Sequence, residues 1–439
     1  MTQATALEAG AAPPDRGLGL RRTVALAMLF LVGTINFLDR QLLSVLVEPI
    51  RAEMQFSDTQ FGLLTGLAFA LFYAAMGVPV AMIADRWNRV KLVGIACVIW
   101  SVFTAACGMV SNFWQLAVMR FGVGTGEAGG TAPSLSVLAD YYPPAQRPFV
   151  SGLFTLNGPF GVFLGTAFGA WAAAHIGWRQ AFFAVGLVGL VVAPLLVWLV
   201  HEPPRGQMDA PARVPADAGT AADASPTFAQ CFAAFVRRPS LRMVLVGSGL
   251  AAFVSYGMLN WIPAFLMRTQ KMPLEAMATW YASAAGLTFG IGILGGGWLV
   301  SRFARRSTRA YGTIPALATL ILVPTLAAAL LVDDWRLSLA LMLLPMAACT
   351  VYVAPALALV QNLTPPGSRA TSVALLLLMF NIVGLGLGPL FVGMVSDALK
   401  ATYGDESLRW ALLSILPFAA AAGVAQYAMA RHLEGDFAE

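Results

Sequence analysis

Four ionisable side chains lie deep within apolar stretches of this 439-residue sequence. Asp39 and Arg40 share one stretch, and Arg120 and Glu127 share another. A charge near the centre of a bilayer costs at least about 2.5–3.5 kcal/mol, so charged residues at that depth usually face a cavity and pair with one another. These four residues are therefore the first candidates for chemistry.

The spacing of the four residues predicts how they pair. Arg120, Gly124 and Glu127 stand at i, i+4 and i+7, so they share one face of a helix. Asp39 and Arg40 are adjacent and point about 100° apart, so one can face a cavity while the other faces a neighbouring helix. We expect Asp39 to pair with Arg120, and Arg40 to pair with Glu127 or with a substrate.

This pattern suits proton exchange and anion binding. A carboxylate whose Arg partner moves away can bind a proton and release it when the Arg returns, which makes Asp39 and Glu127 the proton-coupling candidates. Arg40 can hold an anionic head group such as a phosphate, because its guanidinium binds in a bidentate manner. The alternative is a static ion-pair cluster that fixes two helices together.

Composition excludes most other protein classes. Hydrophobic residues make up 58% of the chain and charged residues 11%, against roughly 25% charged in soluble domains. A soluble domain cannot bury so much apolar surface. We therefore expect neither a soluble enzyme nor a nucleic-acid-binding protein, but a protein that crosses a membrane many times.

Hydropathy predicts an all-α membrane protein of twelve transmembrane helices in two pseudo-symmetric six-helix bundles. About 18 of the 27 Lys and Arg then fall in the inner segments, which places both termini in the cytoplasm. The predicted spans are 23–47, 59–83, 91–111, 113–139, 148–174, 178–200, 242–267, 277–300, 310–332, 337–362, 370–396 and 408–430.

A polar, Pro- and Ala-rich stretch at 201–240 divides the two bundles. A repeat supports this division, because Pro-Pro-Ala-Gln-Arg at 143–147 recurs as Pro-Pro-Gly-Ser-Arg at 365–369. The expected parts are a disordered tail at 1–22, a bundle at 23–200, a linker with an amphipathic segment at 201–240, a bundle at 241–431 and a tail at 432–439.

Two motifs resemble the major facilitator superfamily. The stretch Ala81-Met-Ile-Ala-Asp85-Arg86-Trp-Asn-Arg89-Val-Lys resembles its helix 2–3 signature, with Ala81 and Asn88 where Gly is usual. The stretch Arg120-x-x-x-Gly-x-Gly-x-Ala resembles its helix 4 motif. The resemblance covers nearly the whole chain and implies the two-bundle transporter fold with a central cavity.

A narrower resemblance is to the spinster branch of that superfamily. It rests on the segments Asn36–Gln41, Gly124–Gly130, Asp140–Pro144 and Glu202–Gly206. Spinster relatives transport lipids, such as lysophospholipids and sphingosine phosphates. The resemblance therefore implies an amphipathic, lipid-like substrate. Together with the four deep charges, it leads us to expect an anionic substrate that is moved by alternating access with proton coupling.

The helix 2–3 motif also implies a gate. In the family reading, Asp85 caps the N-terminus of a helix, which we expect to be the span 370–396, when the cavity opens outward. Arg86 and Arg89 belong to the same gate. The alternative is a solvated turn that obeys the positive-inside rule.

Polar and aromatic residues within the spans are candidates for the cavity wall, although each could equally serve in packing. The substrate-binding candidates beside Arg40 and Arg120 are Asn36, Phe69, Tyr73, Asn157, Tyr256, Asn260, Trp261, Tyr352 and Asn381, with Thr155, Ser255 and Tyr281 as further wall residues. The second bundle holds no buried charge, so a charged wall would face a mainly apolar one.

The runner-up function is a proton-coupled multidrug or organic-anion transporter. A lipid scramblase or an intramembrane enzyme is a further alternative, but the spans offer no His and one Asp at depth, so we expect no enzyme. There is no Walker loop, metal-ligand spacing or Cys pair, and we expect no cofactor. The expected partners are protons, the substrate and the lipid bilayer, with no nucleic acid, for a monomer in a bacterial inner membrane.

Overall fold

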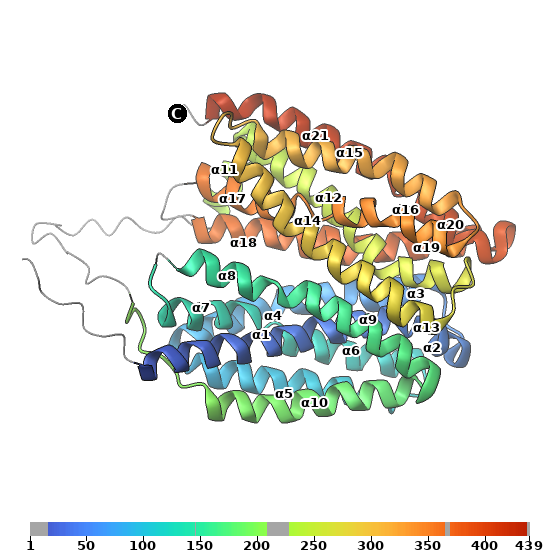
Figure 1. Ribbon diagram of the computed structural model, residues 1–439, viewed down its shortest axis with the longest axis horizontal. Coiled ribbons are helices and arrows are strands. Elements are labelled where there is room, and N and C mark those ends of the chain that lie inside the picture. The colour runs from blue at the N-terminus through green and yellow to red at the C-terminus, as the bar shows by residue number, and fades with distance from the viewer. Residues whose placement is uncertain (1–15, 145, 209–227, 365–368, 437–439) are drawn as a thin grey trace, which may run out of the picture.

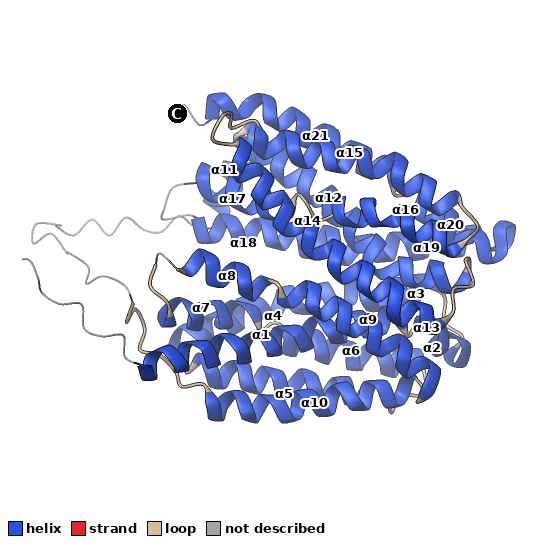
Figure 2. Ribbon diagram, viewed as in Figure 1, coloured by secondary structure: helices blue, strands red, loops and turns tan. Residues whose placement is uncertain are grey.

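The computed structural model describes residues 16–144, 146–208, 228–364 and 369–436, and within these ranges every regular element is a helix (Figure 2). The first ten helices are α1 (Arg16–Val45), α2 (Val47–Met54), α3 (Asp58–Thr65), α4 (Leu67–Arg86), α5 (Arg89–Cys107), α6 (Phe113–Glu127), α7 (Thr131–Tyr141), α8 (Arg147–Thr155), α9 (Asn157–His175) and α10 (Trp178–Leu199).

The remaining elements follow residues 209–227 of the linker. They are α11 (Phe228–Arg237), α12 (Pro239–Arg268), α13 (Leu274–Ala276), the π-helix η1 (Met277–Tyr281), α14 (Ala282–Phe303), α15 (Ala310–Leu331), α16 (Trp335–Ala348), α17 (Val353–Leu363), α18 (Arg369–Met379), the π-helix η3 (Phe380–Leu387), α19 (Gly388–Tyr403), η4 (Gly404–Glu406), α20 (Ser407–Leu413) and α21 (Leu416–Asp436).

These helices form two layers, drawn in blue to green and in yellow to red in Figure 1. Within the first layer α1 packs on α9 and α5 on α10, and within the second α21 packs on α12 and α15. The layers meet where α3 packs on α19, α9 on α14 and α4 on η3. The lower and upper layers hold the first and second parts of the chain.

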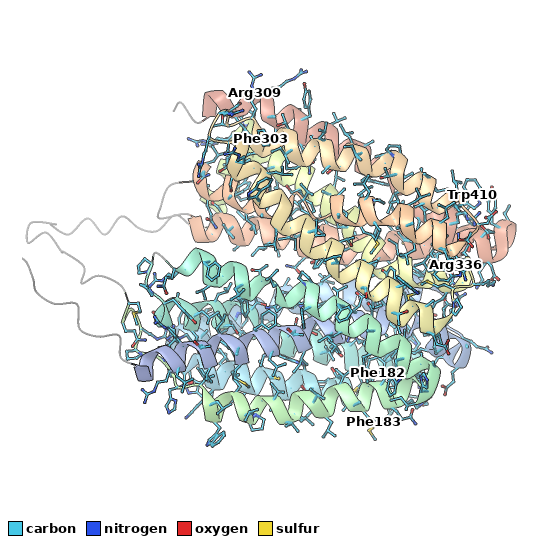
Figure 3. All side chains as sticks on the ribbon, in the orientation of Figure 1. Phe182, Phe183, Phe303, Arg309, Arg336 and Trp410 are labelled. Atoms are coloured by element: carbon cyan, nitrogen blue, oxygen red, sulfur yellow. The ribbon has the colours of Figure 1, made fainter. Side chains whose placement is uncertain are left out.

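Apolar side chains also cover the outside of the molecule, as expected of a protein in a bilayer. Phe182 and its neighbour Phe183 show the contrast on α10, the first wholly buried and the second 42% exposed (Figure 3). Trp198 and Trp298 are largely exposed, and ten segments of the described chain are long and apolar enough to span a membrane.

Ten candidate spans differ from the twelve predicted. The predicted span 113–139 is divided into α6 and α7 by a tight turn at 128–130, where Gly129 N donates to Gly126 O and Gly130 N to Glu127 O. The predicted spans 370–396 and 408–430 fall within one candidate, 371–433. Hydropathy averages over a window, so it detects neither a local turn inside a span nor a short apolar connection between two spans.

Both terminal tails are shorter than predicted. Helix α1 begins at Arg16, and its first turns are held where the Tyr142 hydroxyl donates to Arg22 O and the Arg22 guanidinium lies 5.9 Å from the Tyr142 ring centroid. Helix α21 continues to Asp436 because Leu433 is wholly buried in the second layer. These tertiary contacts stabilise helix ends that lie beyond the apolar spans.

Candidate functional site

Helices α1 and α6 bring the four deep charges together in two ion pairs. Arg120 Nη1 lies 2.9 Å from Asp39 Oδ2, and Arg40 Nε lies 2.6 Å from Glu127 Oε2. Asp39 also accepts a hydrogen bond of 2.9 Å from Thr104 Oγ1 on α5. The structure thus forms both pairs that the spacing predicts.

The two oxygens of the Glu127 carboxylate differ in their hydrogen bonding. The side chain of Glu127 is fully buried, yet within the described residues its Oε1 atom has no hydrogen-bond partner. The Arg120 Nε atom is likewise buried and without a partner among those residues. An unpaired buried polar atom costs about 1–3 kcal/mol, so this arrangement is not one that stability alone would favour.

The ring of Phe69 contacts the guanidinium groups of both Arg40 and Arg120. The guanidinium carbon of Arg40 lies 4.7 Å from the ring centroid of Phe69, and that of Arg120 lies 5.6 Å from it. The rings of Phe37 and Tyr73 also face Arg40, at 5.4 and 5.0 Å. Cation–π contacts hold a charge with weak, adjustable attraction, about 0.5–2 kcal/mol each.

Two neighbouring cavities lie beside this cluster. A small cavity of about 30 Å³ is lined by Arg40 and Arg120, and a larger one of about 240 Å³ is lined by apolar, aromatic and hydroxyl residues with no charged side chain among them. Phe37, Tyr256 and Leu259 line both. The carboxylates of the cluster line neither, so the cations are the charges that face the cavities.

The structure places most of the predicted wall residues around these spaces. Tyr256, Tyr352 and Asn381 line the large cavity with Thr155, Ser255 and Tyr281, and Phe69 and Asn260 line the small one. Asn36 and Asn157 line a separate cavity of about 10 Å³. Tyr73 contacts the Arg40 guanidinium and stacks on the ring of Phe69.

Trp261 has a different position. Its indole N–H donates to Pro389 O at 2.8 Å, and its ring meets Phe61 edge to face with centroids 5.0 Å apart. It lines none of the three cavities. Trp261 therefore packs α12 against α19 and the first layer instead of facing the large cavity.

The three predicted gate residues have different surroundings in this structure. Asp85 and Arg86 are exposed at the end of α4. Arg89 is buried and binds within its own layer, to Asp140 at 2.5 Å and to Glu202 at 2.7 Å. Arg89 thus anchors the first residues of the linker, and the Asp85 cap stays a prediction for another conformation.

The opposite end of the molecule holds a cluster that the motifs did not indicate. We call it the Asp58 end, because it holds Asp58, the first residue of α3. The other end holds Asp85, in the last turn of α4, and we call it the Asp85 end. Asp58 is wholly buried between Arg51 at 2.8 Å and Arg268 at 2.7 Å. Ser396 of α19 donates to the same carboxylate at 2.7 Å.

Three further contacts complete the closure at the Asp58 end. Arg268 binds Glu48 at 2.7 Å, and Asp397 of α19 accepts from the backbone N–H groups of Asp58 and Thr59 at 3.0 and 2.7 Å. A carboxylate suits these free N–H groups at the start of α3. The second layer therefore caps a helix of the first.

The sequence carries a signal for parts of this cluster but not for their contact. Ser57 and Gln60 form a capping box that starts a helix at Asp58, and Arg268 ends a long apolar run. Acids and bases at the ends of separate spans pair only if those ends meet, which no spacing along the chain reveals.

Among groups outside the spans, Glu53 has a shifted pKa. Hydrogen bonds from the Arg179 guanidinium and the Trp178 indole hold the pKa of this exposed carboxyl below its usual range. At the other end, burial raises the pKa of the Tyr142 phenol, which donates to Arg22 O. Both groups support helix ends and lie outside the cavities.

Known proteins are similar to this chain over almost its whole length. A solved bacterial homologue of the human lysosomal transporter spinster, inward-facing and unoccupied, is 30% identical, with a TM-score of 0.85 over 97% of this chain and 99% of that one. An MFS-type efflux pump of Mycolicibacterium smegmatis is 35% identical over 92% of this chain and 91% of that protein.

Spinster homolog 1 of Xenopus laevis is 25% identical, over 88% of this chain and 75% of its own length. The family model of the Major Facilitator Superfamily matches residues 29–375. These relatives are transporters and not enzymes, and their bacterial members indicate an inner-membrane location. The chain is therefore a multi-pass membrane protein that belongs to the Major Facilitator Superfamily and is related to the spinster transporters.

Proposed function

We propose that this protein is a secondary transporter that moves an amphipathic, anionic, lipid-like molecule of the lysophospholipid or sphingolipid type by alternating access, coupled to protons. One observation carries this proposal: a small cavity lined by two arginines shares walls with a larger cavity that has no charge. A head group and an apolar chain would each find a matching environment.

Arg40 is the expected head-group ligand. Its side chain is 19% exposed, and its hydrogen bond to Glu127 uses Nε. No described residue bonds to its Nη groups, so both can bind another partner. Two parallel N–H donors match the oxygens of a phosphate. Arg120 adds positive charge to the lining of the small cavity. Its side chain is 2% exposed and is bound to Asp39.

Glu127 would couple the substrate to a proton. While it is ionised, it competes with an anionic head group for Arg40. A proton on Glu127 removes that competition, so protonation and binding of the anion support each other. Asp39 would act on Arg120 in the same way, and the two carboxylates would load and release protons as the helices move.

Contacts between the layers suggest how access alternates. In this structure the layers are joined at the Asp58 end by Asp58, Arg268 and Asp397. A state open at that end requires these contacts to break. With the predicted orientation, the Asp85 end faces the cytoplasm, and Asp85 would form its cap in the state open to the outside.

A second candidate is the export of apolar organic anions or drugs. It is favoured by the uncharged lining of the large cavity and by the similarity to the M. smegmatis efflux pump. Such a substrate needs the apolar cavity but depends less on Arg40.

Proteoliposomes separate the two candidates. Purified protein would be tested with radiolabelled lysophosphatidylglycerol, sphingosine phosphate and a set of drug-like organic anions, with and without a pH gradient. We expect lysolipid or sphingolipid transport that follows the gradient, is abolished in Arg40→Gln, and loses its gradient dependence in Asp39→Asn and Glu127→Gln. Lys400→Gln, an exposed change on α19, is the control.

The other outcomes are equally clear. Transport of drugs alone, unaffected by Arg40→Gln, supports the efflux candidate and overturns the lipid proposal. Lipid movement that ignores the gradient indicates a scramblase. Accumulation against a gradient by both carboxylate variants contradicts the proposed coupling residues.

A further inference from the structure

The Ser and Thr hydroxyls that line the large cavity are already satisfied. Each of them donates to a backbone carbonyl three or four residues earlier in the chain. These bonds are Thr155 to Ser151 O at 2.7 Å, Ser255 to Ala251 O at 2.8 Å, Thr288 to Ala284 O at 2.6 Å and Thr350 to Ala347 O at 3.2 Å. These groups have little left to offer a ligand.

Tyr281 differs from these Ser and Thr residues. It is wholly buried, it lines the large cavity, and its hydroxyl has no hydrogen-bond partner within the described residues. It ends the π-helix η1, a short irregular turn of a kind that occurs frequently at functional sites. Tyr281 does not line the small cavity where Arg40 lies.

We propose that the Tyr281 hydroxyl is a second polar subsite, which donates a hydrogen bond to an oxygen carried by the apolar part of the substrate. This inference rests on the proposed function and narrows its substrate class. The favoured amphiphile has an anionic head for Arg40 and, along its chain, a keto, ester or ether oxygen. Phe289, Met346 and Phe380 supply the apolar contacts between the two.

The physical reason is that leaving a buried donor unpaired costs more free energy than a typical hydrogen bond contributes. A plain hydrocarbon chain against Tyr281 leaves a buried donor unpaired, and this lowers affinity about 5-fold to about 100-fold relative to a chain that pairs with it. Replacing the hydroxyl by hydrogen removes the penalty. The site therefore discriminates between chains that carry an oxygen and plain hydrocarbon chains, which a purely apolar cavity cannot do.

The test uses full-length protein in nanodiscs and two kinds of lysophosphatidylglycerol. One carries a plain saturated chain, and the other carries a single keto group whose position is scanned along the chain. We expect the wild type to bind one keto isomer about 5-fold to about 100-fold more tightly than the plain lipid. In Tyr281→Phe the keto lipid loses its hydrogen bond, so the ratio should fall to about 1.

Tyr403→Phe is the matched control, since it makes the same chemical change at an exposed position at the end of α19. A ratio that Tyr281→Phe leaves unchanged overturns the subsite. A wild type that binds the keto and plain lipids equally also overturns it, while leaving the lipid proposal intact. If the wild type binds neither lipid, the proposed function itself fails, and Arg40→Gln then has no binding to abolish.

Discussion

At the scale of single residues, this protein holds opposite charges in pairs that differ in their surroundings. Asp39 is satisfied by Arg120 and Thr104, whereas one oxygen of Glu127 lacks a partner among the described residues. Arg40 is the member of the cluster that is partly exposed to a cavity. The pair formed by Arg40 and Glu127 is thus the one better suited to open and close with each cycle.

We predict that Glu127→Gln tightens the binding of anionic lysolipid at every pH at which wild-type Glu127 is ionised, and that it removes the pH dependence of binding. The neutral amide no longer competes for Arg40, so the variant should resemble the protonated wild type at every pH. Binding isotherms measured across a pH series check this. A pH dependence that persists in the variant contradicts the role given to Glu127, and Glu53→Gln serves as a surface control.

We predict that Asp39→Asn lowers the thermal midpoint, because Arg120 would keep its charge without a partner. Removing one member of a buried pair costs about 3–5 kcal/mol. The double variant Asp39→Asn with Arg120→Gln should regain part of that loss, since no lone charge remains. Thermal unfolding in detergent measures Asp39→Asn, Arg120→Gln and the double variant, and simple additivity of the two single effects would contradict direct coupling.

At the scale of elements, two helices from different layers meet through glycines and capping groups. Gly393 of α19 lies against the backbone of Asp58 and Thr59, and Gly62 of α3 lies against the backbone of Pro389 and Leu390. Main chain cannot move aside as a side-chain tip can. This contact exists only while α3 and α19 are together, so it belongs to the state closed at the Asp58 end.

We predict that Gly393→Ala shifts the protein towards the state open at the Asp58 end, because the added methyl group would overlap the backbone of Asp58. Asp58→Asn should shift it in the same direction by weakening the contacts with Arg268. Spin labels at Ala52 and Lys400, both exposed, measure the change as longer distances.

Gly295→Ala is the matched control for that experiment, since a methyl group there has no neighbour within 4 Å. Its distance distribution should equal that of the wild type. Unchanged distances in both Gly393→Ala and Asp58→Asn would show that these contacts do not hold the two layers together.

At the scale of the whole molecule, charge is sorted between the two ends. The Asp58 end carries the ion pairs that join the layers, whereas Arg89 at the Asp85 end pairs within its own layer and holds the linker through Glu202. The two layers can therefore separate at the Asp85 end without breaking the contacts of Arg89. A transporter of this superfamily needs this difference between its ends to bind on one side and release on the other.

We predict that both termini lie in the cytoplasm, because most Lys and Arg fall in the segments on that side. A fluorescent protein fused to the C-terminus should fluoresce in cells, and alkaline phosphatase fused there should be inactive. An active phosphatase fusion would reverse the predicted orientation. Fusions in the loops at residues 176–177 and 332–334 provide the opposite reference.

The sequence by itself determined the helical membrane class, the superfamily and the four deep charges, including their pairing. The class and the deep charges follow from composition and insertion cost, which leave few alternatives, and the superfamily follows from short motifs. The pairing follows from the helical period and from the need of deep charges to find partners. The tertiary structure decided the rest. It placed Trp261 in packing and divided the span 113–139.

Only the tertiary structure brought Asp58 to Arg268 and placed Tyr281 in the lining of the large cavity, with no partner for its hydroxyl in the part of the chain that the structure describes. These features depend on which ends and faces of distant helices meet. Residues more than 200 positions apart form the contacts, and apolar helices carry almost no signal of their partners, because many packings bury the same side chains equally well.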